Sequence, residues 1–544
     1  MSAPTTLSYF EPVTYSSDRP RELDGDASGH RIVVVGAGPV GLTAALDLAQ
    51  RGISVTVVEH DDKVSLGSRA LAISYRSLEI LGRLGIADRY MESGLPWDSG
   101  RSFYRGREIS NFTVPQAPDA QYPGLLNLQQ PFIETYLVEA CLDHPLIDIR
   151  WSTTLTSLAS RADGVTLDLR NSYGDYSIAA DWVVASDGAR STVRELVGTK
   201  LEGTSFSNMF VIVDVRMKSD RPAERLCWFD PPAFPGSTVL MHKQPHDIWR
   251  IDYQVSASLD PDEVTKPDAV LPKVREHLEW IGVEAPWDIE WISLYRAHAL
   301  TLPNYRKDRV VFVGDAAHLL PIFGVRGMNS GIADAANLTW KLAEVIHGRA
   351  DESLIDSFDV EQRDAFQQNK HHARLSTLFM TPGSLGSVLV RDAALDLALV
   401  DETFRALADP RYSTPIDYHV GPLILPEVGD WTGGVGSGAL VPNKPIRADG
   451  EQPVFLNDII GAGFSLLTFD WNPDASHTLP KQVSHIDVKS DSPIGQALDA
   501  RPGSGYLIRP DRHVLARWRA WTPDTVSEAL NLIASPDKDN GYDQ

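Results

Sequence analysis

Residues 31–60 read RIVVVGAGPVGLTAALDLAQRGISVTVVEH, and this stretch decides the fold class. Its first apolar run, Ile32 to Val35, is rich in β-branched residues and predicts a strand buried on both faces. A second run of this kind, Ser54 to Val58, follows a segment with leucines and alanines at helical spacing. Strand, helix and strand in this order predict a βαβ unit with a parallel sheet.

The turn between the first strand and the helix carries glycines in the pattern GxGxxG. Gly36 permits the tight turn, Gly38 lets backbone N–H groups approach a pyrophosphate, and Gly41 lets the helix pack on the strand. Glu59 ends the second strand, where a carboxylate can accept hydrogen bonds from an adenosine ribose. A merely structural glycine turn is the alternative. The complete order of elements favours a dinucleotide site, although this motif does not separate FAD from NAD.

Two later segments place an Asp beside a Gly at the end of an apolar strand. Residues 183–191 read VVASDGARS, and residues 310–341 read VVFVGDAAHLLPIFGVRGMNSGIADAANLTWK. Asp315 can accept a hydrogen bond from a cofactor hydroxyl, and Gly314 lets a cofactor chain pass close to the backbone. The following turn leads into a helix predicted over Asn329 to His347, whose first N–H groups point outward.

These three motifs in this order resemble those of the group A flavoprotein aromatic hydroxylases, which include para-hydroxybenzoate and phenol hydroxylases. The resemblance covers roughly Arg31 to Gly348 and, more weakly, the C-terminal part, and it is strongest to the longer 3-(3-hydroxyphenyl)propionate hydroxylase type. It implies FAD as cofactor, NADH or NADPH as co-substrate, and O2. The implied fold is α/β: a Rossmann-like FAD-binding domain, an inserted antiparallel-sheet substrate domain and a C-terminal thioredoxin-like α/β domain.

The resemblance also implies which residues contact the cofactor. In the family, the segment that matches Asp187 and Gly188 contacts the flavin pyrophosphate region and the reduced nicotinamide nucleotide. A strand-end turn with Asp187 as a helix cap is the alternative. Arg69 matches an arginine near the flavin and phosphates, and Gln129 matches a glutamine that contacts cofactor. The full implied set is Gly36, Gly38, Pro39, Gly41, Glu59, Arg69, Gln129, Asp187, Gly188, Arg190, Gly314, Asp315, Pro321, Gly324, Arg326, Gly327, Met328 and Asn329.

The predicted helix after Gly327 has a further role if its N-terminus faces the flavin. Its partial positive charge, aimed at the N1–C2=O edge, would stabilise the anionic reduced flavin. Many relatives carry Gly-Gln where this chain has Val325 and Arg326, so we expect this loop to move differently. Arg326 adds a cation at the same edge if it points inward, and a solvated loop charge is the alternative. We expect His318 to pack behind the strand.

From about Leu201 to Arg296 the pattern changes to short alternating strands, which predict a half-buried antiparallel sheet. This part resembles the substrate sheet of the family, which sits over the flavin and often carries an arginine near the isoalloxazine. In this chain the matching arginine is Arg250. His242, Asp252 and Tyr295 could orient or deprotonate a phenol, and the alternative for each is a hydrogen-bonded residue at the rim of the sheet. The candidate catalytic residues are Arg250, His242, Asp252 and Tyr295.

The mechanism implied by the family is reduction of FAD by NAD(P)H, capture of O2 as a C4a-hydroperoxyflavin, and transfer of one oxygen to a phenolic ring. Protein groups must then exclude water, place the ring carbon and help to remove the phenolic proton. We expect no metal site. A flavin halogenase is disfavoured because no WxWxIP segment occurs. An FAD-dependent oxidase or dehydrogenase of the same fold, and a flavin-binding protein without turnover, are the alternatives.

The composition agrees with an ordinary globular enzyme. The chain has 544 residues, of which 43% are hydrophobic and 23% charged, so disordered and collagen-like classes are excluded. Its 50 Lys and Arg against 73 Asp and Glu give a formal charge of −23, which disfavours nucleic acid or an anionic membrane surface as partner. Cys141 and Cys227 are too few for a bridged framework, and no apolar run reads as a leader or a membrane span. We therefore expect a cytoplasmic protein.

The C-terminal part begins with charged helical sequence and a glycine-rich linker and continues with strand-like runs. It lacks cysteines, so a thioredoxin-like domain here would act in structure, and we expect it to contribute to a homodimer. The predicted divisions are 1–30, a flexible N-terminal segment; 31–95, 126–200 and 301–350, the FAD-binding domain; 96–125 and 201–300, the substrate domain; 351–425, a helical segment and linker; and 426–544, the C-terminal domain.

Overall fold

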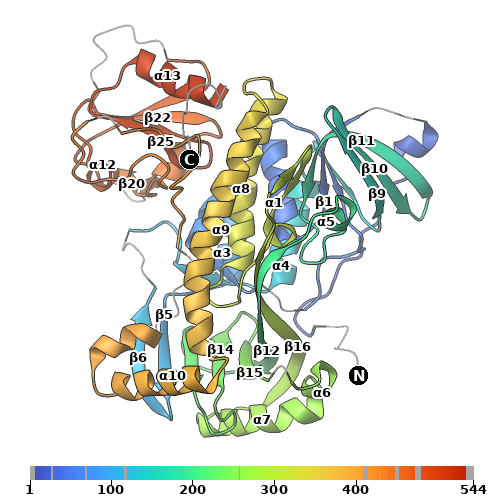
Figure 1. The fold of residues 1–544 in the computed structure, drawn as a ribbon, viewed down its shortest axis with the longest axis vertical. Helices are drawn as coiled ribbons and strands as arrows, with labels where there is room; N and C mark the ends of the chain where they lie inside the picture. The colour runs from blue at the N-terminus through green and yellow to red at the C-terminus, as the bar shows by residue number, and fades with distance from the viewer. Residues whose placement is uncertain are drawn as a thin grey trace.

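The structure, a computed structural model, describes residues 7–25, 29–67, 70–114, 119–256, 258–408, 414–427, 429–447, 453–471 and 479–534. Three regions are visible in Figure 1: a sheet with long helices against it in the upper part, a second sheet below, and a smaller α/β unit beside the helices. The expected mixed α/β class is confirmed.

The first sheet is built around β1 (His30–Val35), which pairs in parallel with β2 (Val55–Val58) and β11 (Gly174–Ala185). The strand order is β17-β18-β11-β1-β2-β8, and the antiparallel strands β10 and β9 extend β11. All of β2 and all but one residue of β1 are buried, as their apolar sequences predict. The remaining strands are β8 (Ile147–Arg150), β9 (Thr154–Arg161), β10 (Gly164–Asn171), β17 (Arg306–Lys307) and β18 (Val310–Phe312).

Long helices pack against this sheet and against one another. α1 (Pro39–Gln50) follows β1 and contacts both α4 (Gln130–Leu142) and α8 (Gly327–Ile346). α9 (Ser353–Met380) lies along α8 and continues down to the second sheet (Figure 1). The N-termini of α1 and α8 lie in two of the three motif segments that the sequence analysis identified.

The second sheet has the order β19-β16-β12-β15-β14-β13-β5-β6. Its lower face is covered by α7 (Pro267–Trp280) (Figure 1). Val270 and Val274 of this helix belong to the same buried apolar cluster as Trp249 and Ile251 of β15. The prediction of a half-buried sheet is therefore wrong for its centre, because the opposite face is also shielded. The strands are β5 (Ser99–Tyr104), β6 (Arg107–Thr113), β12 (Glu202–Met217), β13 (Arg225–Phe229), β14 (Thr238–Lys243), β15 (Ile248–Val255), β16 (Trp287–Thr301) and β19 (His318–Leu319).

Residues 7–25 are packed along the two sheets. The Tyr9 ring stacks on His246 with 5.9 Å between centroids, and Tyr15 stacks on Trp151 at 4.6 Å. Ser8 donates from its hydroxyl to Glu290 at 2.7 Å. The expectation of a flexible segment therefore does not describe these residues, since their aromatic side chains are anchored by both domains.

The C-terminal unit is a mixed sheet with the order β23-β22-β24-β25. It is joined to the long helices by buried charges: Glu361 on α9 lies 2.7 Å from both Lys341 on α8 and Arg509 after β24. Its elements are β22 (Phe464–Phe469), β23 (Val483–Val488), α12 (Pro493–Ala497), β24 (Gly505–Ile508), β25 (Val514–Trp518) and α13 (Pro523–Ala534).

The other elements connect these regions. The short strands β3, β4 and β7 form a separate three-stranded sheet with the order β3-β7-β4. No helix among the described residues has both the length and the apolar character needed to cross a bilayer. These connecting elements are η1 (Arg21–Asp24), β3 (Ala72–Ser74), α2 (Tyr75–Arg83), α3 (Ala87–Ser93), β4 (Leu95–Trp97), β7 (Leu125–Asn127), α5 (Thr192–Leu196), α6 (Pro261–Val264), η2 (Gly314–Ala316), α10 (Leu385–Ala398), η3 (Glu402–Ala408), β20 (Pro445–Arg447), β21 (Val454–Phe455) and α11 (Leu456–Ile459).

Candidate functional site

A cavity of about 1000 Å³ runs between the first sheet and the second. Its walls include the ends of β1, β2 and β11, the N-termini of α1 and α8, and one face of the second sheet. Most residues that the sequence predicts as functional line it together. These are Gly36, Gly38, Pro39, Glu59, Asp187, Gly188, Asp315, Pro321, Gly324, Arg326, Gly327, Met328 and Asn329 on the first side, and His242, Arg250, Asp252 and Tyr295 on the second.

The GxGxxG turn shapes one end of this cavity. Gly36 has φ of 105°, and a Cβ there would lie 2.6 Å from the Ser186 carbonyl oxygen, so only glycine is tolerated. A Cβ on Gly38 would meet nothing within 4 Å. Gly38 caps α1 without any side-chain hydrogen bond, which leaves the first N–H groups of the helix for another acceptor. Open space beside an uncapped helix N-terminus fits the phosphates of a dinucleotide.

Gly41 lies behind the cavity and is not part of its lining. A Cβ at this position would lie 2.0 Å from the carbonyl oxygen of Gly36. The residue is therefore required for close packing of α1 on the turn, as the motif predicts, and contributes to the cavity only through that packing.

Glu59 ends β2 and its carboxylate lies at the cavity wall. One oxygen accepts a hydrogen bond from the Ala37 N–H at 2.6 Å and the other accepts from the Asp61 N–H at 3.0 Å. Burial raises the pKa of this carboxyl group. Because a carboxylate oxygen has more than one acceptor position, Glu59 can hold the glycine turn and still accept from a ligand hydroxyl.

Asp187 helps to cap a helix and also lines the cavity. Its Oδ2 accepts from the Val193 N–H at 2.9 Å and so helps to cap α5. Its Oδ1 is buried and has no hydrogen-bond partner among the described residues. Burial raises the pKa of this carboxyl. Arg190, by contrast, is exposed and outside the cavity lining, so the structure does not bring it to the site.

The glutamine before α4 is not at the cavity. Gln129 directs its side-chain amide to the Pro245 carbonyl oxygen, at 2.9 Å, whereas the next residue, Gln130, lines the cavity. Gln130 accepts from the Ala70 N–H at 2.9 Å and donates to Glu134 at 2.6 Å. Gln129 is therefore not among the cavity-lining residues, whereas Gln130 is, because the chain turns into α4 there and directs the two side chains differently. Arg69 lies outside the described residues.

The loop before α8 is held in an unusual conformation. Val325 has φ of 55°, in the left-handed region that a β-branched residue rarely adopts. Arg326 is only 2% exposed, and its Nη1 donates to the Phe323 carbonyl oxygen at 3.0 Å. The alternative of a solvated loop charge is therefore wrong, because the guanidinium is enclosed beside the cavity. α8 begins without a side-chain cap, so its first N–H groups also remain for an acceptor.

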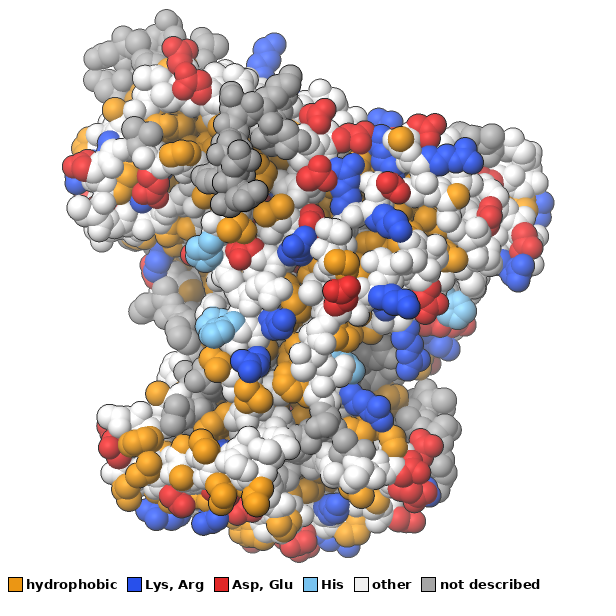
Figure 2. Space-filling model, in the orientation of Figure 1, with side chains coloured by type: hydrophobic (Ala, Val, Ile, Leu, Met, Phe, Trp, Pro, Cys, Tyr) orange, Lys and Arg blue, Asp and Glu red, His pale blue; other side chains and the backbone are white. Residues whose placement is uncertain are grey.

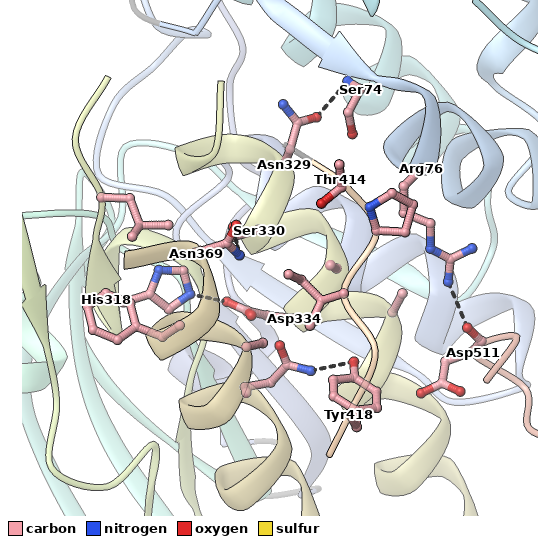
Figure 3. Close-up of a pocket in the computed structure, with 18 of the residues that line it drawn as sticks. Ser74, Arg76, His318, Asn329, Ser330, Asp334, Asn369, Thr414, Tyr418 and Asp511 are labelled. Carbon is pink, nitrogen blue, oxygen red and sulfur yellow. Dashed lines mark hydrogen bonds and ion pairs between the residues drawn. The ribbon is translucent and has the colours of Figure 1, made fainter. Parts of the chain in front are cut away.

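Supporting contacts fix the start of α8 (Figure 3). Asn329 accepts from the Ser74 N–H at 2.9 Å and donates to the carbonyl oxygens of Ala72 and Val325. Asp334, two turns along the helix, accepts from the Gly314 N–H and from His318. Gly314 is not in the lining itself, but it positions Asp315, which is. Ser74, His318, Asn329 and Asp334 also border a second, small cavity of about 50 Å³ beside α8 and α9.

The register of the second sheet brings polar and charged residues of four strands into one row. Arg225 lies opposite His242, His242 opposite Arg250, and Arg250 opposite Asp214. Arg250 donates from Nε to Asp214 Oδ1 at 3.0 Å, and both side chains are buried. Arg225 also lines the cavity, and sequence reasoning missed it because only the pairing of β13 with β14 places it there.

The neighbouring row contains Asp252 between the apolar side chains of Ile212 and Leu240. Asp252 is 7% exposed, and its Oδ1 has no hydrogen-bond partner among the described residues. Burial raises the pKa of its carboxyl to about 7, against the opposing effect of Arg250. A carboxyl with this pKa is both a competent proton acceptor and a competent donor near neutral pH.

The other two candidates have different chemistry. Burial and the nearby cations Arg225 and Arg250 hold the pKa of His242 well below its usual value, so this imidazole is neutral. Burial raises the pKa of the Tyr295 hydroxyl, which donates to the Leu320 carbonyl oxygen at 3.0 Å. His242 therefore contributes a neutral imidazole to the cavity lining, and Tyr295 contributes a hydroxyl group that stays protonated.

Comparisons with known proteins agree with this geometry. A sequence profile of the FAD binding domain family matches residues 30–373. A 3-(3-hydroxy-phenyl)propionate/3-hydroxycinnamic acid hydroxylase of Mycolicibacterium smegmatis is 29% identical over 92% of each chain. A protein of the same name from Mycobacterium sp. strain KMS is 31% identical over 82% of this chain and 76% of the relative.

Solved structures share the fold. The flavin-dependent monooxygenase PieE, determined in complex with FAD and substrate, superposes with a TM-score of 0.76 at 23% identity and covers 93% of this chain and 99% of its own. The p-nitrophenol 4-monooxygenase PnpA of Pseudomonas putida has a TM-score of 0.60 at 27% identity, over 70% of this chain and 96% of its own.

Proposed function

Because the chain belongs to the FAD-dependent aromatic hydroxylases that carry this FAD binding domain, we propose that it inserts one oxygen atom of O2 into a phenolic substrate. NADH or NADPH is the proposed reductant. The two relatives are named for hydroxylated phenylpropionate and cinnamic acids, and these two acids are the first substrates to test.

The observation that carries this proposal is the composition of the large cavity. One side offers the N-termini of α1 and α8, neither of which has a side-chain cap. The same side carries the carboxyl groups of Glu59 and Asp187, which follow the ends of β2 and β11. The other side offers a sheet face with an acidic group of near-neutral pKa, Asp252. A dinucleotide cofactor suits the first side and a small organic substrate suits the second, so that cofactor and substrate would meet inside one enclosed space.

We propose that the cofactor is held by the lining residues of the first side. The N-terminus of α1 would receive the pyrophosphate, Glu59 a ribose hydroxyl, and Asp315 a ribityl hydroxyl. The N-terminus of α8 and the buried Arg326 would face the electron-accepting end of the flavin. When bound and reduced, the flavin supplies the electrons and the activated oxygen for ring hydroxylation.

The substrate is proposed to lie between the flavin end of the cavity and the second sheet. Ile212 and Leu240 give this face an apolar centre for an aromatic ring. His242 and Tyr295 flank it as neutral polar groups, and the buried pair of Arg250 with Asp214 bounds it on one side. Arg250 would therefore orient the substrate as part of an ion pair.

We propose that the four-stranded C-terminal unit is a thioredoxin-like domain with a structural role, and that the protein is a homodimer. Large apolar side chains are exposed on and beside α10, over which Figure 2 shows them gathered; they are Leu385, Leu389, Val390 and Val400. Sedimentation equilibrium would test the dimer. The two described cysteines, both buried and free, support a reducing location.

The decisive experiment is a coupled assay. The purified protein, loaded with FAD, is mixed with NADH or NADPH and each candidate phenol under air. We expect the phenol to stimulate oxidation of the nucleotide and mass spectrometry to find a product heavier by one oxygen atom. Nucleotide oxidation that never yields a hydroxylated product would refute the proposal.

A further inference from the structure

Asp252 is the acidic side chain that the second sheet contributes to the described lining of the large cavity, and it lies between apolar side chains. It lies on β15 with Ile212 and Leu240 opposite on the two neighbouring strands. Its Oδ1 is buried without a hydrogen-bond partner among the described residues, although it belongs to the cavity lining. A buried acceptor without a donor costs about 1–3 kcal/mol, so a protein retains one where a ligand supplies the donor.

The other polar groups on this face do not offer an acceptor of equal strength. Arg250 has no acceptor atom and is held by Asp214. The Tyr295 hydroxyl is already donating to the Leu320 carbonyl oxygen, and burial raises its pKa. His242 is a weak base because burial and two arginines hold its pKa low.

We infer that Asp252 is the catalytic residue that accepts the phenolic proton of the substrate, through Oδ1. This inference rests on the proposed phenol hydroxylation and adds to it the base and the place of the phenolic oxygen. The ring would lie on Ile212 and Leu240, with its hydroxyl directed at β15. The three side chains come from adjacent strands, so the sheet itself sets the distance between ring and carboxylate.

In the proposed step, Asp252 removes the proton of the phenolic hydroxyl group. The phenolic O–H bond breaks, the proton passes to Asp252, and the electron pair stays on the phenolic oxygen. That pair enriches the ring carbon that forms the new C–O bond with oxygen derived from O2, while NADH or NADPH supplies the two electrons that reduce the other oxygen atom to water. The ring then loses its C–H proton and becomes aromatic again, and Asp252 returns its proton to the new phenol or to solvent.

The charges around Asp252 determine its pH response. Arg250 lies on the same strand, and Asp214, Arg225, His242 and Tyr295 face it from β12, β13, β14 and β16. Burial raises the pKa of Asp252 to about 7, Arg250 and Arg225 oppose the rise, and Asp214 reinforces it. The carboxylate is therefore available above this pH and is lost below it.

The first test compares Asp252→Asn with Asp288→Asn, both as FAD-loaded enzymes, on 3-(3-hydroxyphenyl)propionate. Asp288 lies on β16 of the same sheet, is exposed, and pairs only loosely with Arg216 at 3.6 Å, so its replacement controls for loss of a sheet carboxylate. General base catalysis is worth about 100-fold or more in rate. We expect the hydroxylation rate to fall by this factor in Asp252→Asn and not in Asp288→Asn. We also expect the rate of the wild type to rise with pH through about pH 7, and this rise to be absent in Asp252→Asn. A retained rate, or an unchanged pH profile, would overturn the inference.

The second test uses binding, so that its result does not depend on turnover. The probe is 4-nitrophenol, studied at a pH where it is already ionised, with equilibrium dialysis against each FAD-loaded enzyme. The nitrophenolate anion has already lost its proton, so it has none to give to Asp252. An ionised Asp252 carboxylate repels this anion. We expect Asp252→Asn to bind the probe at least about fivefold more tightly than the wild type, with Asp288→Asn unchanged. Equal affinities in wild type and Asp252→Asn, whether measurable or not, would overturn the inference.

The two tests separate the failure of the inference from the failure of the proposed function. If the wild type hydroxylates none of the phenols tested, the proposed function fails, and the binding comparison still decides whether Asp252 faces a phenolic oxygen. If the wild type hydroxylates the phenylpropionate and Asp252→Asn does so equally well, the function stands and the assignment of the base falls.

Discussion

His318 donates to Asp334 across 2.7 Å, and both side chains are almost completely buried behind the cofactor side of the large cavity. The same carboxylate oxygen accepts the Gly314 N–H at 2.8 Å. Through Asp334, α8 therefore holds the turn that presents Asp315 to the cavity. His318 acts as a support for that turn, which agrees with its expected place behind the strand.

This pair predicts how stability depends on pH. Burial alone would lower the pKa of His318, but the charge and hydrogen bond of Asp334, with a smaller effect of Asp315, together raise it. A histidine with a raised folded pKa stabilises the fold fully below its unfolded pKa of about 6.5, and this contribution is lost as pH rises through the folded value. We expect the melting temperature of the wild type to fall over this range by more than that of His318→Gln. Differential scanning calorimetry from pH 6 to pH 9 would measure it.

The exposed His371 provides the control for that comparison. His371→Gln should retain the full pH dependence of the wild type. If His318→Gln also retains it, the pair does not titrate in this range and the stated coupling is wrong.

Arg250 is tied to Asp214 in a buried ion pair, and this changes what its removal should do. Arg250→Ala leaves the Asp214 carboxylate buried without its main partner, which costs about 3–5 kcal/mol of unfolding free energy. Adding Asp214→Asn should recover part of that loss, because the uncompensated charge disappears. Urea denaturation of the two single variants and the double variant gives the coupling energy. Additive losses would mean that the two side chains do not act as a pair.

Glu59 links the glycine turn to the end of β2, and it is the proposed ribose acceptor. Glu59→Ala should weaken FAD retention by about 1–3 kcal/mol, the scale expected when buried hydrogen-bond partners are left unpaired. Flavin fluorescence released on dilution measures this. Glu195→Ala, which removes an exposed carboxylate of α5, is the matched control. Retention equal to that of the control would rule out the role given to Glu59.

The sequence predicted the elements of the cofactor side well because their signals are local. Gly36, Gly38 and Gly41 are specified by a single tight turn between a strand and a helix, and their spacing alone implies that geometry. Asp187 and Asp315 likewise follow directly from the ends of apolar strands. Such motifs depend on few residues that are close in sequence.

The substrate side could not be predicted to the same depth. The pairing of β13, β14, β15 and β12 is what brings Arg225, Asp214 and Arg250 together. The sequence of a single strand does not determine its register with strands far away in the chain. Which of Gln129 and Gln130 lines the cavity has a similar origin, since the direction of a side chain at a helix start depends on the local turn. The composition of residues 7–25 predicted a flexible segment. In the structure, Tyr9 and Tyr15 stack on aromatic rings of segments that are distant in sequence.

Val325 stands at the start of the loop that leads into α8, with φ of 55°. A β-branched residue in this conformation is strained by about 1–3 kcal/mol, whereas glycine adopts it freely at an entropic cost of about 0.5–1 kcal/mol. Val325→Gly should therefore stabilise the protein by about 1 kcal/mol, and we expect a melting temperature higher by a few degrees. The same change at the exposed Val400, where φ is ordinary, should lower it. A lower melting temperature for Val325→Gly would mean that packing of the valine side chain outweighs the backbone strain, and that the loop is held by its side chain at this point.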